Sequence, residues 1–267
     1  MLRFFRSLFS AADDQIGPAI PPGQRIYAVG DVHGCDALFA ALIAAIEADD
    51  AAAPRASTTV ILLGDLVDRG PNSAGVVRRA RMWQQQRPVR ILCGNHEEMF
   101  LASFTNAEVM RHFLRHGGKQ TLVSYGLDPK AIVGSELEDL QALMAQKVPQ
   151  AERDYLGTFE DMIRIGDYVF VHAGIDPELD LTQQVSTTLR WIREPFLSHA
   201  EPYEAVVVHG HTISENPEDR GNRIGVDTGA YASGRLTAVV LEGTRRRYIE
   251  AVQNTDGTIT TGGRVAD

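Results

Sequence analysis

Five short apolar runs, each typical of a buried β-strand, are followed directly by side chains that can bind metal ions. The runs are residues 26–29, 60–63, 89–93, 168–171 and 205–208. The polar segments that follow them carry Asp, His or Asn, and they are residues 30–34, 64–70, 94–97, 172–174 and 209–212. In an open α/β sheet, ligands bind at the carboxyl ends of the strands. The pattern therefore predicts an α/β fold with one metal site built from five strand ends.

Helical patterns separate the first three runs. Residues 39–46 and 76–80 carry apolar side chains at helical spacing, and a third helix is expected to begin at His96. Strands that alternate with helices at short spacing indicate βαβ units and a largely parallel sheet. Three later runs follow without such helices, and we expect them to form a β-meander: residues 223–227, 236–241 and 247–252.

The chain is expected to form one domain with an insertion. Residues 1–24 form an N-terminal arm that ends in a proline-rich linker. Residues 25–253 form the domain, and residues 99–164 form a helical insertion above the strand ends, because they are helix-rich and lack the metal-binding motifs. Residues 254–267 are rich in Gly and Thr, and we expect a loose C-terminal tail.

The N-terminal arm carries Phe4, Phe5, Leu8 and Phe9, which can form one apolar helical face. Such a face can lie on a membrane or on a partner. We favour the alternative that it packs on the protein's own body or frays. The apolar part is interrupted by Arg6 and is too short for a secretory signal.

Composition excludes several classes of protein. The net charge of −9 argues against a nucleic-acid partner, which requires a basic surface. It also means that a site for an anionic substrate must carry its own positive charge. The two cysteines, Cys35 and Cys93, are too few for a disulfide framework and suit packing in a reducing compartment, so we expect a cytoplasmic protein. No apolar run approaches the length of a membrane span.

The candidate ligands suit a pair of metal ions. Asp31 and His33 are two residues apart on an extended segment and point the same way, so both can bind one ion. Asp65 can bridge two ions through its two oxygens. Mixed oxygen and imidazole ligands suit Mn, Fe or Zn, and six ligands suit two ions about 3.5–4 Å apart. The other strand ends supply the remaining candidates: Asn95, His172 and either His209 or His211.

Three neighbouring residues are suited to phosphate chemistry rather than to metal binding. His96 follows Asn95 directly and can serve as the general acid for a leaving oxygen. Asp68 can bind the other ring nitrogen of His96 and fix its orientation. Arg69 offers a fork of donors that matches a phosphate group.

Two further histidines have the spacing of a metal-binding helix pair. His112 and His116 are four residues apart, but no acidic partner lies near them in the sequence. His116 precedes two glycines, as is typical of a helix C-terminus. We interpret both as surface or capping residues.

Three motifs occur in the order Gly-Asp-Val-His-Gly, Gly-Asp-Leu-Val-Asp-Arg-Gly and Gly-Asn-His-Glu. Together they resemble the motifs of the PPP-type serine/threonine phosphatases, in their bacterial and phage-like branch. These enzymes belong to the calcineurin-like metallophosphoesterases, and the resemblance covers roughly residues 25–241. It implies a β-sandwich flanked by helices and a binuclear metal site. The first ion would take Asp31, His33 and Asp65, and the second would take Asp65, Asn95, His172 and His211.

Further features of the resemblance indicate which histidine, which arginine and which substrate class to expect. A histidine before threonine is the ligand in the bacterial version, which selects His211. The segment Trp-Ile-Arg-Glu resembles the one that bears a second phosphate-binding arginine, which selects Arg193 over Arg190. The segment His-Ala-Gly-Ile also resembles the diadenosine tetraphosphate hydrolases. Those relatives typically lack an acidic residue at the position of Asp68 and have Asp at that of Glu97, so both residues favour the protein phosphatases.

The sequence therefore predicts a metal-dependent phosphomonoesterase that acts on phosphoserine and phosphothreonine, with phosphotyrosine as a further substrate. The metals activate the attacking water, and His96 acts as general acid. We expect two divalent ions, Mn first with Fe or Zn as alternatives, and a phosphoprotein or phosphopeptide partner.

The alternative is a hydrolase of diadenosine tetraphosphate or another small phosphoanhydride. A non-catalytic phosphate-binding module is disfavoured because His96, Asp68 and Arg69 are all present. The oligomeric state stays open.

Overall fold

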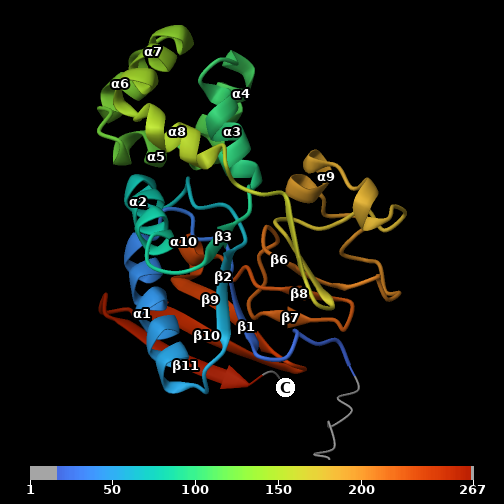
Figure 1. Ribbon diagram of the computed structural model, residues 1–267. Coiled ribbons are helices and arrows are strands. Elements are labelled where there is room, and N and C mark those ends of the chain that lie inside the picture. The colour runs from blue at the N-terminus through green and yellow to red at the C-terminus, as the bar shows by residue number, and fades with distance from the viewer. Residues whose placement is uncertain (1–16, 266–267) are drawn as a thin grey trace, which may run out of the picture.

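Two β-sheets pack face to face, and helices cover their outer faces (Figure 1). The strand order is β11-β10-β9-β1-β2-β3 in the first sheet and β4-β5-β6-β8-β7 in the second. The first sheet consists of β1 (Gln24–Val29), β2 (Ser57–Leu62), β3 (Val89–Ile91), β9 (Arg235–Glu242), β10 (Arg245–Gln253) and β11 (Ile259–Val265). The second consists of β4 (Met162–Ile165), β5 (Tyr168–Val171), β6 (Val206–His209), β7 (Glu218–Asp219) and β8 (Arg223–Gly225).

The helices form three groups around the sheets. The outer face of the first sheet is covered by α1 (Asp36–Ala52) and α2 (Ser73–Gln84). A helical lobe follows β3, and its members are α3 (Asn95–Ser103), α4 (Ala107–Phe113), a kinked segment (Leu114–Gly118), α5 (Lys119–Ser124), α6 (Pro129–Gly134), α7 (Leu137–Lys147) and α8 (Gln150–Leu156). The third group lies in the second half of the chain and comprises a 3₁₀ turn (Leu181–Gln183), α9 (Ser186–Trp191) and α10 (Ala230–Ser233).

The computed structural model describes residues 17–265. The apolar face expected for Phe4, Phe5, Leu8 and Phe9 therefore lies outside the described residues. In the described part of the chain, no helix is both long and apolar enough to cross a membrane.

The predicted fold class is confirmed. β1, β2 and β3 are parallel neighbours, and α1 and α2 connect them. The space between the sheets is filled by alternate residues of strands from both, such as Ile61 of β2, Phe170 of β5 and Val239 of β9. The helical lobe lies above the ends of β1 and β2 (Figure 1), where we expected the insertion of residues 99–164. The domain boundaries themselves stay a prediction.

The expected β-meander of residues 223–252 is wrong in one strand. β9 and β10 are antiparallel neighbours in the first sheet, but β8 lies in the second sheet, parallel to β6. Ile224 of β8 is buried between the two sheets. An apolar strand is stabilised equally well by either sheet, and its residue pattern does not specify which one it joins.

The expected loose tail of residues 254–267 is also wrong. Ile259–Val265 form β11, which pairs antiparallel with β10 at the edge of the first sheet. The backbone makes this pairing, so Gly and Thr residues contribute to it as other residues do. Ile259 also packs against the core beneath α1.

One buried arginine links β1 to its neighbour β9 and to the helix α1. Arg25 is 0% exposed and donates hydrogen bonds to the carboxylates of Glu242 and Asp50 and to the carbonyl of Pro54. A buried guanidinium without such partners would be strongly destabilising. This cluster therefore joins the start of β1 to the end of β9 and to the end of α1.

We expect Asp50→Asn to lower the free energy of unfolding by about 2 kcal/mol at neutral pH, because it removes a charged partner of Arg25. Partial burial acts to raise the pKa of Asp50, but hydrogen bonds from Thr58, Arg25 and Arg87 hold it below its ordinary value. The stabilisation is therefore complete above the ordinary pKa of about 4 and is lost as the pH falls through the lower folded-state pKa. Urea unfolding from neutral to acidic pH measures this effect. Exposed Glu201→Gln is the control, and an equal loss in both variants would contradict the prediction.

Candidate active site

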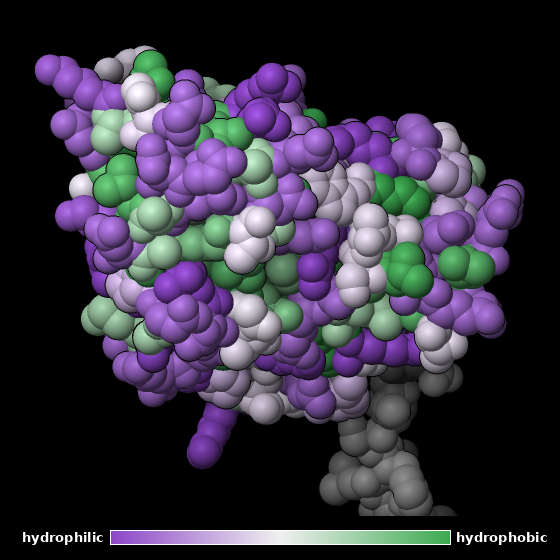
Figure 2. Space-filling model, turned by 90° about the horizontal axis from the view of Figure 1, so that it is seen from above, coloured by the Kyte–Doolittle hydropathy of each residue, from purple (hydrophilic) through white to green (hydrophobic). Residues whose placement is uncertain are grey.

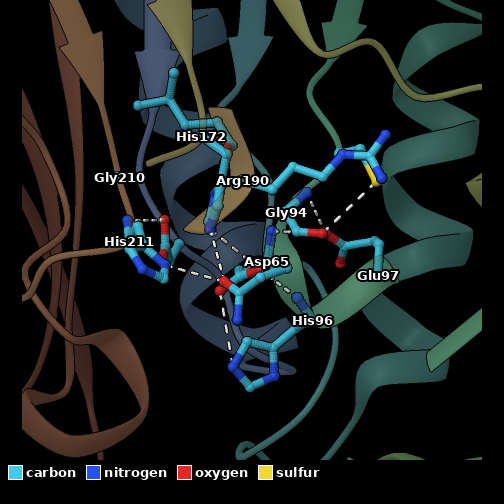
Figure 3. Close-up of polar contacts among 12 residues, drawn as sticks. Asp65, Gly94, His96, Glu97, His172, Arg190, Gly210 and His211 are labelled. Carbon is cyan, nitrogen blue, oxygen red and sulfur yellow. Dashed lines mark hydrogen bonds and ion pairs between the residues drawn. The ribbon is translucent and has the colours of Figure 1, made fainter. Parts of the chain in front are cut away.

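The candidate ligands converge where β1, β2, β3, β5 and β6 end. Asp65 lies at the centre, with His172 and His211 on one side and His96 on the other (Figure 3). All of the predicted ligands are buried, with exposed fractions between 0% and 8%. They are Asp31, His33, Asp65, Asn95, His172 and His211.

Two clusters of potential ligands share Asp65. One consists of Asp65, His33 and His96, and the other of Asp65, His172 and His211, with the ligand atoms of each cluster within 4.8 Å of one another. Oδ2 of Asp65 lies 3.5 Å from Nε2 of His33, whereas Oδ1 lies 3.4 Å from Nε2 of His172. Each oxygen of Asp65 therefore faces a different cluster, as a bridging carboxylate requires.

Asn95 belongs to the second cluster. Its Oδ1 lies 3.0 Å from Nε2 of His172 and 2.9 Å from Nδ1 of His211. His209, the alternative that the sequence left open, lies elsewhere. Its ring packs against Phe196, and its Nδ1 contacts the carbonyl of Gly210 at 3.0 Å. The structure thus brings His211 rather than His209 to the other ligands.

Asp31 lies beside an acidic residue to which the sequence analysis gave no role. The carboxylate of Asp31 accepts the backbone N–H of His211 at 3.0 Å, and it also interacts with the carboxyl group of Asp227. Burial, Asp227 and Asp65 together raise the pKa of Asp31. Burial also raises the pKa of Asp227, to about 6. Neighbouring carboxylates of this kind are relieved by a proton or a cation between them.

Several buried polar atoms at the site have no hydrogen-bond partner among the described residues. These atoms are Nε2 of His33, Oδ2 of Asp65, Nε2 of His211 and Oδ2 of Asp227. Unpaired polar groups are costly when buried, and those that remain require an explanation such as a bound ion. Oxygen and imidazole donors together fit divalent ions such as Mn, Fe or Zn.

The histidines are held in the state that binds metals. Nδ1 of His33 donates to the carbonyl of Val67, and Nδ1 of His172 donates to the carbonyl of Leu63, both at 2.8 Å. These bonds leave Nε2 of each ring as the free lone pair. Burial lowers the pKa of His33 and of His211 to about 3. The rings are therefore neutral and able to act as ligands at physiological pH.

His96, a member of the first cluster, is also held by two residues of the second motif. Its Nδ1 lies 2.7 Å from Oδ2 of Asp68, and Nη2 of Arg69 donates to its Nε2 at 3.0 Å. Burial acts to lower the pKa of His96, but the carboxylates of Asp65 and Asp68 outweigh it and raise the pKa. Asp68 is held in turn by the hydroxyl of Thr121, 2.6 Å away. Thr121 lies far from Asp68 in the sequence, and no motif marks it.

Of the two candidate arginines after β5, Arg193 is the one available to a ligand. Arg193 is exposed, and its Nη2 lies 3.5 Å from the carbonyl of His211. Arg190 is paired with Asp161 and with Glu98. The roles assigned to Arg193 and to the other site residues stay predictions.

Glu97 builds the site without pointing into it. Its carboxylate accepts the backbone N–H groups of Asp65 (2.8 Å), Leu66 (2.7 Å), Val67 (3.3 Å) and Gly94 (2.9 Å). The sequence analysis considered Glu97 only as a mark of substrate class. The structure shows that it fixes the loop that carries the shared carboxylate (Figure 3).

This fold and this site define a metal-dependent phosphoesterase, with two ligand clusters that share Asp65 and an arginine in contact with His96. The chain belongs to the calcineurin-like phosphoesterase family, whose model matches residues 24–232. The family implies divalent metal ions, which the ligand clusters fit.

Individual relatives agree with this assignment. A symmetrical bis(5'-nucleosyl)-tetraphosphatase from Acidovorax ebreus is 33% identical over 69% of this chain, and the match spans only 52% of that protein. The asymmetrical bis(5'-nucleosyl)-tetraphosphatase PrpE of Bacillus velezensis is 26% identical over 78% of this chain and 86% of its own length.

Solved structures share the fold. A putative diadenosine tetraphosphatase superposes with a TM-score of 0.59 at 22% identity, covering 92% of this chain and 98% of its own. A cold-active protein-tyrosine phosphatase of a Shewanella species superposes with a TM-score of 0.55 at 19% identity, covering 91% and 83%. At these identities the likeness supports the fold alone.

We expect the protein to bind two Mn²⁺ ions per chain and Asp65→Asn to retain fewer than one, because both ions depend on this carboxylate. Metal content after dialysis, measured by elemental analysis, tests this. Asp161→Asn, which removes a carboxylate that pairs with Arg190 outside the two clusters, is the control and should retain both ions. Retention of one full ion by Asp65→Asn would show that the clusters do not share their ligand.

Proposed function

We propose that this protein hydrolyses the phosphoanhydride bonds of dinucleoside tetraphosphates. Relatives of the symmetrical and of the asymmetrical kind are named bis(5'-nucleosyl)-tetraphosphatases, and a structural neighbour is named a putative diadenosine tetraphosphatase. The observation that carries the proposal is the contact of Arg69 with His96 at two ligand clusters that share Asp65. This arrangement suits the transfer of a phosphate group to water.

The residues have separable tasks in this reaction. When bound, the divalent ions would lower the pKa of the attacking water and stabilise charge on the phosphate oxygens. Arg69 presents its guanidinium to the phosphate, because only one of its nitrogens is engaged with His96 in the structure. Asp68 accepts Nδ1–H of His96 and leaves Nε2 facing Arg69, so Nε2 can carry the proton for the leaving oxygen once Arg69 turns to the phosphate.

The sequence analysis favoured phosphoserine and phosphothreonine, and the comparisons do not confirm that preference. They agree better with the alternative of a small phosphoanhydride. Phosphomonoesters remain the second candidate because of one specific observation, the Asp68–His96 pair. A general acid matters most for an alkoxide leaving group, whereas a phosphate leaving group departs readily without protonation.

We expect His96→Asn to reduce kcat about 100-fold or more on a phosphoserine peptide and distinctly less on diadenosine tetraphosphate. The physical reason is that loss of the acid penalises the more basic leaving group. Steady-state kinetics of the Mn-loaded enzyme on both substrates measures the two losses. His199→Asn, a substitution of a histidine that stacks on Tyr203 outside the site, is the control.

Relative kcat/KM of the wild-type enzyme on the two substrates decides between the candidates. A higher value for diadenosine tetraphosphate supports the proposal, and a higher value for the peptide would overturn it in favour of a phosphoprotein phosphatase. No hydrolysis of either substrate at any Mn concentration would overturn both.

A further inference from the structure

We propose that a basic depression beside the active site binds the additional phosphates of a polyphosphate substrate, those beyond the one under attack. The inference rests on the proposed function and deepens it, because it assigns recognition of the phosphate chain to named residues. These residues, Arg115 and Lys119, lie in the helical lobe, at the kink between α4 and α5. None of the motifs found in the sequence includes them.

The depression borders the metal site through Arg69 and Tyr231. It has a volume of about 600 Å³, and its lining includes Arg69, Arg115, His116, Lys119 and Tyr231. Arg69 connects it to the chemistry through its contact with His96 at 3.0 Å. The ring of Tyr231 lies 5.4 Å from the ring of His33, and the guanidinium of Arg69 lies 4.8 Å from the centre of the Tyr231 ring. A phosphate at Arg69 would therefore have the depression as its immediate neighbour.

The kink that forms this wall is fixed to the site by the backbone. Gly117 has a φ of 107°, which glycine adopts without strain, and its carbonyl accepts the N–H of Arg69 at 3.2 Å. A Cβ atom at Gly117 would lie 2.5 Å from that nitrogen. His116 closes the preceding helix, because its Nδ1 donates to the carbonyl of His112 at 2.8 Å. This bond agrees with the capping role expected for His116.

The basic groups at the kink are free to bind an anion. Arg115 and Lys119 are exposed, and neither forms an ion pair with any residue from 17 to 265. Other arginines of the chain, such as Arg79 and Arg87, are paired with carboxylates. In a protein of net charge −9, unpaired positive groups beside an anion-processing site raise the local concentration of anionic substrates. Hydrophilic side chains cover much of the face seen from above (Figure 2).

A single phosphate does not use this depression. Arg69 and the ions that the two ligand clusters would hold account for the phosphate under attack, and Arg115 and Lys119 are additional to them. A tetraphosphate chain carries further negative groups at short spacing, which guanidinium and ammonium donors bind with charge-assisted hydrogen bonds. An acidic peptide around a phosphoserine is the rival occupant, and the test below separates it.

The test compares the Arg115→Ala/Lys119→Ala double variant with the Mn-loaded wild-type enzyme. The substrates are diadenosine tetraphosphate, an acidic phosphoserine peptide and 4-nitrophenyl phosphate, which carries one phosphate. We expect KM for the tetraphosphate to rise about tenfold or more, and the ratio of kcat/KM on the tetraphosphate to that on 4-nitrophenyl phosphate to fall by a similar factor. The matched control is Lys130→Ala, which removes an exposed positive charge from α6 and should leave the ratio unchanged. Thermal unfolding of each variant checks that it folds.

Each result supports or overturns a defined statement. Cleavage of the tetraphosphate by the wild-type enzyme with an unchanged ratio in the double variant would overturn this inference alone. A selective loss on an acidic phosphoserine peptide, without a loss on the tetraphosphate, would overturn it in favour of peptide recognition. Failure of the wild-type enzyme to cleave the tetraphosphate would overturn the proposed function, and this inference with it.

Discussion

The site depends on one buried carboxylate that does not face it. Glu97 accepts four backbone N–H groups, three from the loop that carries Asp65 and one from Gly94. The space around Asp65 is tight, because a Cβ atom at Gly94 would lie 2.1 Å from its Oδ1. The two ligand clusters exist because Asp65 presents one oxygen to each. Their geometry therefore follows from the position of Glu97 at the start of α3, which in turn follows from the parallel pairing of β2 and β3.

Backbone conformation shows where the fold stores strain. Among residues 17–265, the non-glycine residues with positive φ are His33, Asp65, Asp68, Arg69 and His211, with φ between 44° and 73°. Side chains other than glycine rarely adopt this conformation, and it persists only where surrounding contacts enforce it. All five belong to the active site, as ligands or as neighbours of the general acid. The hydrogen bonds that Glu97 accepts, those of Thr121 with Asp68 and the core between the sheets offset this cost, so that the functional groups are held in place before substrate arrives.

Much of the site could be predicted from sequence because parallel strands place their carboxyl ends together. Residues that directly follow a strand, such as Asp31, Asp65 and His172, therefore converge whatever the connections are. Periodicity did not distinguish His209 from His211, because the chain turns sharply at His211, where φ is 62°. Thr121 and the role of Asp227 were not predictable, since their partners are distant in sequence and only tertiary packing brings them together. The same limit explains β8 and β11, whose sheet and pairing depend on backbone contacts that local composition does not encode.

The lobe is joined to the catalytic loop by hydrogen bonds as well as by apolar packing. Thr121 of α5 holds Asp68, and the carbonyl of Gly117 holds the N–H of Arg69. The groups that hold Asp68 and Arg69 thus come from the helical lobe. The lobe is consequently not a module that another sequence can replace freely. A relative that acquires different helices must rebuild both anchors, so substrate preference and catalytic rate are expected to diverge together in this family.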